Sequence, residues 1–285
     1  MAERWVPSLS FFLVMVVLHS ADASIPAMFI LGDSTADVGT NSLLSFSIIR
    51  ADFPFNGIDF PSSQPTGRFS NGFNTVDFLA NLTGFQKSRP PFLSLVNSQS
   101  SMNKQFLKGV SFASGGSGLL DTTGQSLNLF ELGARKFAIV GVPPIGCCPL
   151  SRLADINDHC HKEMNEYARD FQTILSALLQ KLSSEYGGMK YSLGNAYEMT
   201  MNVIDDPPAF NLKDVKSACC GGGRLNALLP CLQPLATVCS NRDDYLFWDL
   251  VHPTQHVSKL EAETLYSGPP RLVSPINFSQ LVEDN

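Results

Sequence analysis

A long amphipathic pattern between two short apolar runs constrains the fold of this chain most strongly. Between positions 164 and 182, apolar residues recur every three or four positions, as on one face of a helix. They are Met164, Tyr167, Phe171, Ile174, Leu175, Leu178, Leu179 and Leu182. The flanking runs, 136–142 and 190–193, have the composition of strands, and Gly187-Gly188 ends the helical pattern. Strand, helix and strand in this order predict a βαβ unit, and hence an α/β fold with a parallel sheet flanked by helices.

A third apolar run, residues 27–31, is followed directly by Gly32, Asp33 and Ser34. We expect this run to be a strand of the same sheet, buried on both faces. Ligands of open α/β sheets bind beyond the carboxyl ends of the strands, so a serine hydroxyl on this turn would lie at the mouth of a pocket. Gly-Asp-Ser is also common in ordinary turns, and the tripeptide alone does not distinguish the two.

Two stretches predict less regular structure. Residues 53–85 are rich in Pro, Gly, Asn and Ser, which indicates an extended surface excursion with one short helix around 75–80. The segment after Gly268 is interrupted by prolines and is expected to be irregular. No internal repeat or low-complexity linker divides the chain.

The first 23 residues have the pattern of a secretory signal peptide. One arginine precedes the apolar run 11–18, and a small-x-small site ends at Ala23. A membrane anchor is the alternative, but a spanning helix needs ~20 apolar residues, and no later run is long enough to span either. We therefore expect residues 1–23 to be removed and residues 24–285 to form a single secreted, extracellular domain.

The seven cysteines all lie in the second half of the chain. They are Cys147, Cys148, Cys160, Cys219, Cys220, Cys231 and Cys239. Behind a signal peptide they are expected to form disulfides, and a zinc site is disfavoured because no C-x-x-C spacing occurs. Adjacent cysteines seldom bond to each other, so non-neighbours such as Cys231 and Cys239 are the candidate partners, with at least one thiol left free.

The charge and the sequons of the chain are also consistent with a secreted protein that binds no nucleic acid. The net charge is −6, and no Lys/Arg cluster suggests a nucleic-acid partner. Two sequons, at Asn81 and Asn277, predict N-glycosylation on the secretory route. No motif indicates an oligomeric state.

A second polar motif lies near the C-terminus, where Asp249 and His252 are three residues apart and Pro253-Thr254 follows. Imidazole can take the proton of a serine hydroxyl near neutral pH, and a carboxylate can hold the imidazole in the required tautomer. A capped helix start with a surface histidine is the alternative. His252 and His256 are four apart, but Pro253 and the lack of a third ligand argue against a metal site.

Taken together, these motifs resemble the plant GDSL esterase/lipase family of the SGNH hydrolase superfamily. The resemblance runs through nearly the whole chain after the signal peptide, in one order. The matching segments are 29–39, 65–72, 109–118, 132–136, 142–149, 219–221 and 248–254.

The resemblance implies an SGNH-type, flavodoxin-like parallel sheet flanked by helices and hydrolysis of small-molecule or lipid esters without a metal or organic cofactor. It implies Ser34 as the nucleophile, His252 as the base and Asp249 as its orienting carboxylate. The oxyanion hole would be formed by the backbone N–H groups of Ser34 and Gly115.

One family block has no counterpart. The family places Gly-x-Asn-Asp, whose Asn donates to the oxyanion, between the Gly-rich block and Leu132; here residues 118–128 run directly into Leu129. Several tens of residues, including a central strand, are lacking, and Asn157-Asp158 lies too late to replace them. Loss of one oxyanion donor costs about 10²–10³ in rate. The alternative function is therefore a catalytically impaired or inactive secreted glycoprotein, a shortened form of a GDSL hydrolase.

Overall fold

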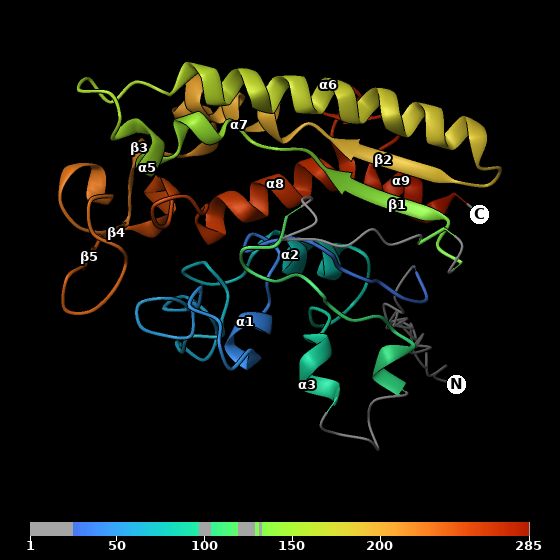
Figure 1. Cartoon of the computed structure of the whole chain (residues 1–285), viewed down its shortest axis with the longest axis horizontal. Helices are drawn as coiled ribbons and strands as arrows, with labels where there is room; N and C mark the ends of the chain where they lie inside the picture. The colour runs from blue at the N-terminus through green and yellow to red at the C-terminus, as the bar shows by residue number, and fades with distance from the viewer. Residues whose placement is uncertain (1–24, 97–103, 119–128, 131–132, 285) are drawn as a thin grey trace, which may run out of the picture.

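A computed structural model describes residues 25–96, 104–118, 129–130 and 133–284. The predicted signal peptide and the junction at 119–128 lie outside these described residues. The fold is mixed α/β, with small sheets and covering helices (Figure 1). The α/β class expected from the sequence is therefore confirmed.

The predicted βαβ unit is present. Strand β1 (Lys136–Val140) is followed by helix α6 (Lys162–Glu185) and by β2 (Lys190–Gly194), which pairs in parallel with β1. Helix α6 runs along one side of these strands, and helices α8 (Gln255–Ser267) and α9 (Phe278–Glu283) lie on the other side (Figure 1). The periodic pattern thus predicted both the elements and their order.

The remaining elements are short. The helices are α1 (Thr40–Leu43), α2 (Thr75–Leu82), α3 (Phe92–Val96), α5 (Pro149–Arg152) and α7 (Ala196–Asp205). The strands are β3 (Asp214–Ala218), β4 (Cys220–Gly221), β5 (Thr237–Val238), β6 (Tyr245–Phe247) and β7 (Val273–Ser274). The described strands form three sheets, ordered β1-β2-β7, β3-β6 and β4-β5. The short helix expected around 75–80 is α2.

The run 27–31 departs from its prediction as a strand buried on both faces. It pairs in parallel with residues 108–112 through three backbone hydrogen bonds and the isolated bridge Ile30–Ser111, but Phe29 and Leu31 are 50% and 46% exposed. Within the described residues, nothing pairs with its other edge, and β1 likewise pairs only with β2. The prediction that this run is buried on both faces is therefore wrong.

The region 53–85 is not merely a surface excursion, because many of its polar side chains are buried. Arg68 Nε lies 2.7 Å from Asp77 Oδ2, and Asp77 also forms a capping box with Asn74 at the start of α2. Asn71 Oδ1 accepts a hydrogen bond from the N–H of Gln255 at 2.8 Å, at the start of α8. A loop rich in Asn and Asp can be ordered by such bonds as firmly as by an apolar core.

The C-terminal segment is also more regular than expected, because it contains β7 and α9. Their side chains join an apolar core between α2, α7 and α8. The buried members of that core are Leu79, Met199, Ala262, Leu265, Val273 and Phe278. Burial of each large apolar side chain contributes about 1.5–3 kcal/mol, which outweighs the helix-breaking effect of the prolines around them.

Three disulfides link the cysteines, and they correct the expected pairing. Cys231 bonds to Cys220, and Cys239 bonds to Cys219, so the Cys231–Cys239 pair is wrong. The third disulfide joins Cys147 to Cys160. Cys148 is the free thiol that the odd number required, and it is buried. None of the helices in the described ranges is long and apolar enough to cross a membrane.

The buried thiol gives a first prediction. Burial, with a smaller contribution from the charge of Asp249, raises the pKa of Cys148 to about 12. A thiol reagent added at pH 8 without reductant should therefore not react with the native protein, and should find a single thiol once the protein is denatured. Rapid reaction in the native state, or more than one thiol after unfolding, would contradict the disulfide pattern.

Candidate active site

The Asp249–His252 turn follows β6 and is fixed by its own backbone. Asp249 Oδ1 accepts hydrogen bonds from the N–H groups of Val251 at 3.0 Å and of His252 at 2.9 Å. The N–H of Trp248 donates to the carbonyl of His252 at 2.8 Å, which closes the turn. Trp248 is buried, and its indole N–H donates to Asn56 Oδ1 at 3.0 Å. The aspartate therefore both shapes the turn and faces the imidazole.

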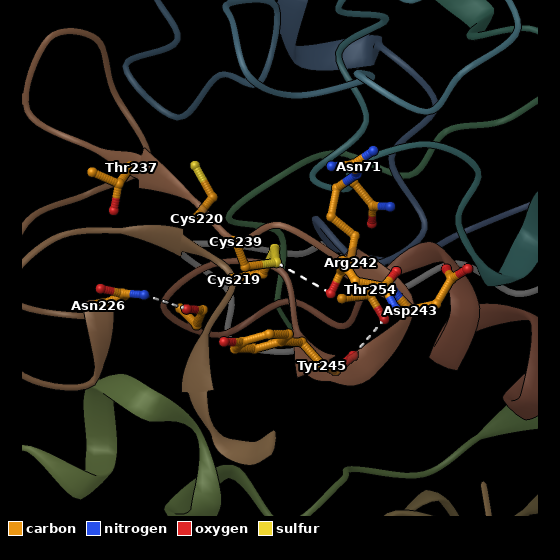
Figure 2. The surroundings of a disulfide bond; sticks show 12 residues. Asn71, Cys219, Cys220, Asn226, Thr237, Cys239, Arg242, Asp243, Tyr245 and Thr254 are labelled. Atoms are coloured by element: carbon orange, nitrogen blue, oxygen red, sulfur yellow. Dashed lines mark hydrogen bonds between the residues drawn. A yellow bond between two sulfur atoms is a disulfide. The ribbon is translucent and has the colours of Figure 1, made fainter. Parts of the chain in front are cut away.

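Helix α8 begins immediately after this turn. Thr254 is its N-cap: its hydroxyl accepts from the N–H of Val257 and donates to the carbonyl of Tyr245 at 2.8 Å. Figure 2 shows Thr254 and Tyr245 beside the disulfide that joins Cys219 to Cys239. The alternative drawn from the sequence is therefore only half right: the helix start is capped, but His252 is buried and not on the surface.

Ser34 is brought to His252 from the other end of the chain. It lies in a turn closed by the N–H of Ala36, which donates to the carbonyl of Asp33 at 3.2 Å. Ser34 Oγ is 2.8 Å from His252 Nε2, and His252 Nδ1 is 2.8 Å from Asp249 Oδ1. With the Nδ1 proton on the Asp249 side, Nε2 is free to accept the serine proton. Nucleophile, base and carboxylate are recognised in serine hydrolases by this geometry.

Electrostatics favour the ionised pair. Burial opposes protonation of His252, but the charge of Asp249 and their hydrogen bond outweigh it and raise the pKa of the imidazole. Burial likewise opposes ionisation of Asp249, and the facing imidazolium lowers the pKa of that carboxyl below its usual value. The pair therefore stabilises the imidazolium that forms when a serine proton is taken.

The Gly115 amide departs from its expected role in an oxyanion hole. Its N–H donates to Asp37 Oδ2 at 3.0 Å, so its hydrogen is already used inside the protein. In the described part of the chain, the N–H groups of Ser34 and Gly116 donate to no protein acceptor. The amides of Ser34 and Gly116 are therefore among those that remain available near the Gly-rich block.

Asp37 organises this block, and sequence reasoning gave it no role. Its buried carboxylate accepts hydrogen bonds from the N–H groups of Gly39, Thr40 and Asn41 as well as from that of Gly115. The carboxylate thus joins the turn after Ser34 to the Gly-rich segment. The signal was present, since Asp37 lies within the matching segment 29–39, but no spacing rule singled it out.

Asn41 does not replace the missing oxyanion asparagine. Its Nδ2 donates to the carbonyl oxygens of Ile49 at 2.8 Å and Gly115 at 2.9 Å, which uses both of its amide hydrogens. Asn157 and Asp158 are no substitute either, because Asp158 lies in the loop before α6 and pairs with Arg224 at 3.2 Å. Asn157 shares that loop.

Phe69 is a second neighbour of the triad that sequence reasoning missed. Its ring centroid lies 5.0 Å from that of His252, with the planes inclined by 33°. A Cβ atom at Gly115 would lie 3.0 Å from the Phe69 ring, so this side chain spans the space between the histidine and the Gly-rich segment. An apolar ring there limits the access of water to the imidazole.

The remaining predicted positions lie elsewhere. Asn81 is exposed at the end of α2, and Asn277 is the N-cap of α9. His256 Nε2 lies 3.1 Å from the carbonyl of Phe210, whereas His252 Nε2 contacts Ser34, so the two imidazoles have different partners.

Comparison with known proteins agrees with this geometry. The model of the GDSL-like lipase/acylhydrolase family matches residues 122–265. GDSL esterase/lipase At5g55050 of Arabidopsis thaliana is 31% identical, over 91% of this chain and 90% of that protein. GDSL esterase/lipase At1g71250 of the same plant is also 31% identical, over 93% and 91%. The chain belongs to the GDSL-like lipase/acylhydrolase family and is an ester hydrolase of the esterase/lipase kind.

The same alignments show a length difference. The alignment with the first relative spans 342 positions, more than the 285 residues of this chain, so several tens of positions of the relative have no counterpart here. This agrees with the lack of a Gly-x-Asn-Asp block in the sequence and with the open edges of β1 and the run 27–31. The relatives nevertheless favour a hydrolase over the inactive-glycoprotein alternative.

The paired ionisation of Asp249 and His252 predicts a pH dependence. His252 must be neutral to accept a proton, so kcat/KM for a soluble ester should rise with pH through the raised pKa of His252. Asp249→Asn removes the charge that raises this pKa. The acid limb should therefore move to lower pH, and the plateau should fall by about 10⁴. An acid limb at the same pH in both proteins would contradict the assigned coupling.

Asp37 gives a separate, activity-independent prediction. In Asp37→Asn an amide N–H₂ faces backbone N–H groups, so at least one buried hydrogen bond is lost. The free energy of unfolding in urea should fall by about 1–3 kcal/mol. Asp205→Asn, at an exposed position at the end of α7, serves as the control and should stay within about 0.5 kcal/mol of wild type. Equal stability of both variants would refute the role given to the Asp37 carboxylate.

Proposed function

We propose that this protein is a secreted carboxylic-ester hydrolase that works through an acyl-enzyme formed on Ser34. The observation that carries the proposal is the continuous hydrogen-bonded series from Ser34 Oγ to His252 Nε2 and from His252 Nδ1 to Asp249. A serine hydroxyl needs an adjacent base to be nucleophilic, and this base has its own orienting carboxylate.

The reaction proceeds in two halves. His252 takes the hydroxyl proton as Ser34 Oγ bonds to the ester carbonyl carbon, and the imidazolium then gives that proton to the departing alcohol as the ester C–O bond breaks. In the second half His252 takes a proton from water, which attacks the acyl-serine. The acid leaves, and the proton returns to Ser34. Asp249 stays ionised throughout and stabilises the imidazolium.

Negative charge develops on the carbonyl oxygen in both halves. We assign its stabilisation to the N–H groups of Ser34 and Gly116, in place of the Gly115 amide, which Asp37 engages. With no asparagine side chain as a third donor, the rate should lie about 10²–10³ below that of a relative that has one. The reaction requires no metal or organic cofactor.

Secretion belongs to the same proposal. A signal peptide over residues 1–23 and a single domain over 24–285 fit the three disulfides, which persist in oxidising compartments. Of the two sequons, Asn81 is exposed and accessible to glycosylation. Asn277 caps α9 through its side chain, and its Nδ2 lies 3.5 Å from the carbonyl of Gly268.

The decisive experiment compares the mature wild-type chain with Ser34→Ala on p-nitrophenyl esters of several acyl lengths. Wild type should hydrolyse at least one of them, and Ser34→Ala should lose about 10³-fold or more in kcat, because no other group supplies the nucleophile. Ser184→Ala, at an exposed position on α6, is the matched control and should retain activity. Equally slow hydrolysis by wild type and Ser34→Ala, with unchanged thermal unfolding, would refute the mechanism.

A further inference from the structure

The segment that follows the first turn of α1 exposes large apolar side chains. We call residues 43–49 the apolar loop; it contains Leu43, Leu44, Phe46, Ile48 and Ile49 and no charged residue. Phe46 and Ile48 are each 98% exposed, and the other three are also exposed. Single exposed apolar residues are common, but five within seven positions mark a surface that meets an apolar partner.

The apolar loop is held by hydrogen bonds at both ends. Asn41 Nδ2 donates to the carbonyl of Ile49 at 2.8 Å, and the hydroxyl of Ser47 donates to the same carbonyl at 2.9 Å. The guanidinium of Arg50 donates to the carbonyl of Ser42 at 2.5 Å. The backbone is thus tied down on both sides of Phe46, so its outward direction is fixed by the fold.

The base of the apolar loop borders the catalytic site. A Cβ atom at Gly115 would lie 3.1 Å from Ile49, and one at Gly116 would lie 2.8 Å from it. Gly115 also approaches Phe69, whose ring packs on His252. Ile49 and Phe69 therefore line a short apolar path from the exposed loop to the imidazole that contacts Ser34.

Charge decides what kind of apolar partner fits. Arg50, which directly follows the loop in the sequence, pairs with Asp52 at 3.0 Å, and the chain carries a net charge of −6. An anionic surface would be repelled, whereas a neutral or zwitterionic one would not. The loop also carries no hydrogen-bonding side chain larger than serine with which to recognise a polar ligand.

We propose that the apolar loop docks on a neutral or zwitterionic lipid surface, with Phe46 and Ile48 inserted, and so presents Ser34 to esters at that surface. This inference rests on the proposed function, which gives carboxylic esters as the substrate class. Docking would narrow that class to water-insoluble esters in aggregates or membranes. Docking itself requires no catalysis. It is driven by the burial of apolar area and is insensitive to salt.

The test uses the double variant Phe46→Ser/Ile48→Ser in the mature chain, with Ile156→Ser as the matched control. Ile156 is an 84% exposed isoleucine in the loop between α5 and α6, a loop that lies apart from α1 in Figure 1. Two readouts are taken: co-sedimentation with phosphatidylcholine vesicles at low and high salt, and the ratio of the rate on emulsified trioctanoin to that on dissolved p-nitrophenyl acetate.

Wild type and Ile156→Ser should bind the vesicles equally at both salt concentrations. The double variant should lose about tenfold or more in partitioning and in the rate ratio, because two large apolar side chains no longer leave water. Wild type that does not bind vesicles, or a double variant that binds as wild type does, overturns the proposal. So does wild-type dimerisation that the double variant abolishes without any vesicle binding, since a second copy would then cover the loop.

The two proposals can fail separately. If wild type hydrolyses neither ester, the function proposed for Ser34 fails, and vesicle binding alone decides whether the apolar loop docks. If wild type hydrolyses both esters but the rate ratio is unchanged in the double variant, the esterase stands and the docking proposal fails.

Discussion

The candidate site depends on buried polar pairs that hold two parts of the chain together without a shared sheet. Ser34 lies in the N-terminal part, while Asp249 and His252 lie in the C-terminal part. The two parts are joined by Asn56 to Trp248 and by Asp59 to Arg242, whose guanidinium keeps the pKa of the Asp59 carboxyl low against the opposing effect of burial. Helix α2 packs on α8 beside these pairs. Each pair is specific in direction, so together they fix the 2.8 Å approach of serine to imidazole more closely than apolar packing alone would.

Periodic and local signals predicted much of this structure. The 164–182 pattern predicted α6 and its flanking strands, because helix geometry places such residues on one face whatever else surrounds them. The contact between Asp249 and His252 was predictable because the two residues share one turn. The exposure of Phe29 and Leu31 was not, because burial of a strand depends on its neighbours. The disulfide partners and the engagement of Gly115 by Asp37 depend on contacts between distant segments, which one sequence does not encode in any spacing.

Comparison with the longer relatives shows which contacts hold the candidate site in this shorter chain. The relatives contain several tens of positions without counterpart here, yet the carboxylate of Asp33 stabilises the turn at Ser34 and that of Asp249 stabilises the turn at His252. In each case a carboxylate accepts hydrogen bonds from backbone N–H groups nearby in the sequence. Both turns are therefore locally supported, although β1 and the run 27–31 each have one unpaired edge within the described residues.

Two disulfides, Cys219–Cys239 and Cys220–Cys231, determine when the turn that carries His252 becomes rigid after synthesis. The N–H groups of Cys219 and Cys220 donate to the carbonyls of Phe247 and Trp248, directly before Asp249, and both cysteines are crosslinked to the segment that follows. The turn that carries His252 is thus anchored to a part of the chain that two disulfides crosslink, and such links form and persist in oxidising environments. A newly synthesised, still reduced chain would hold its histidine loosely. Formation of these two disulfides would therefore complete the site proposed for Ser34, Asp249 and His252.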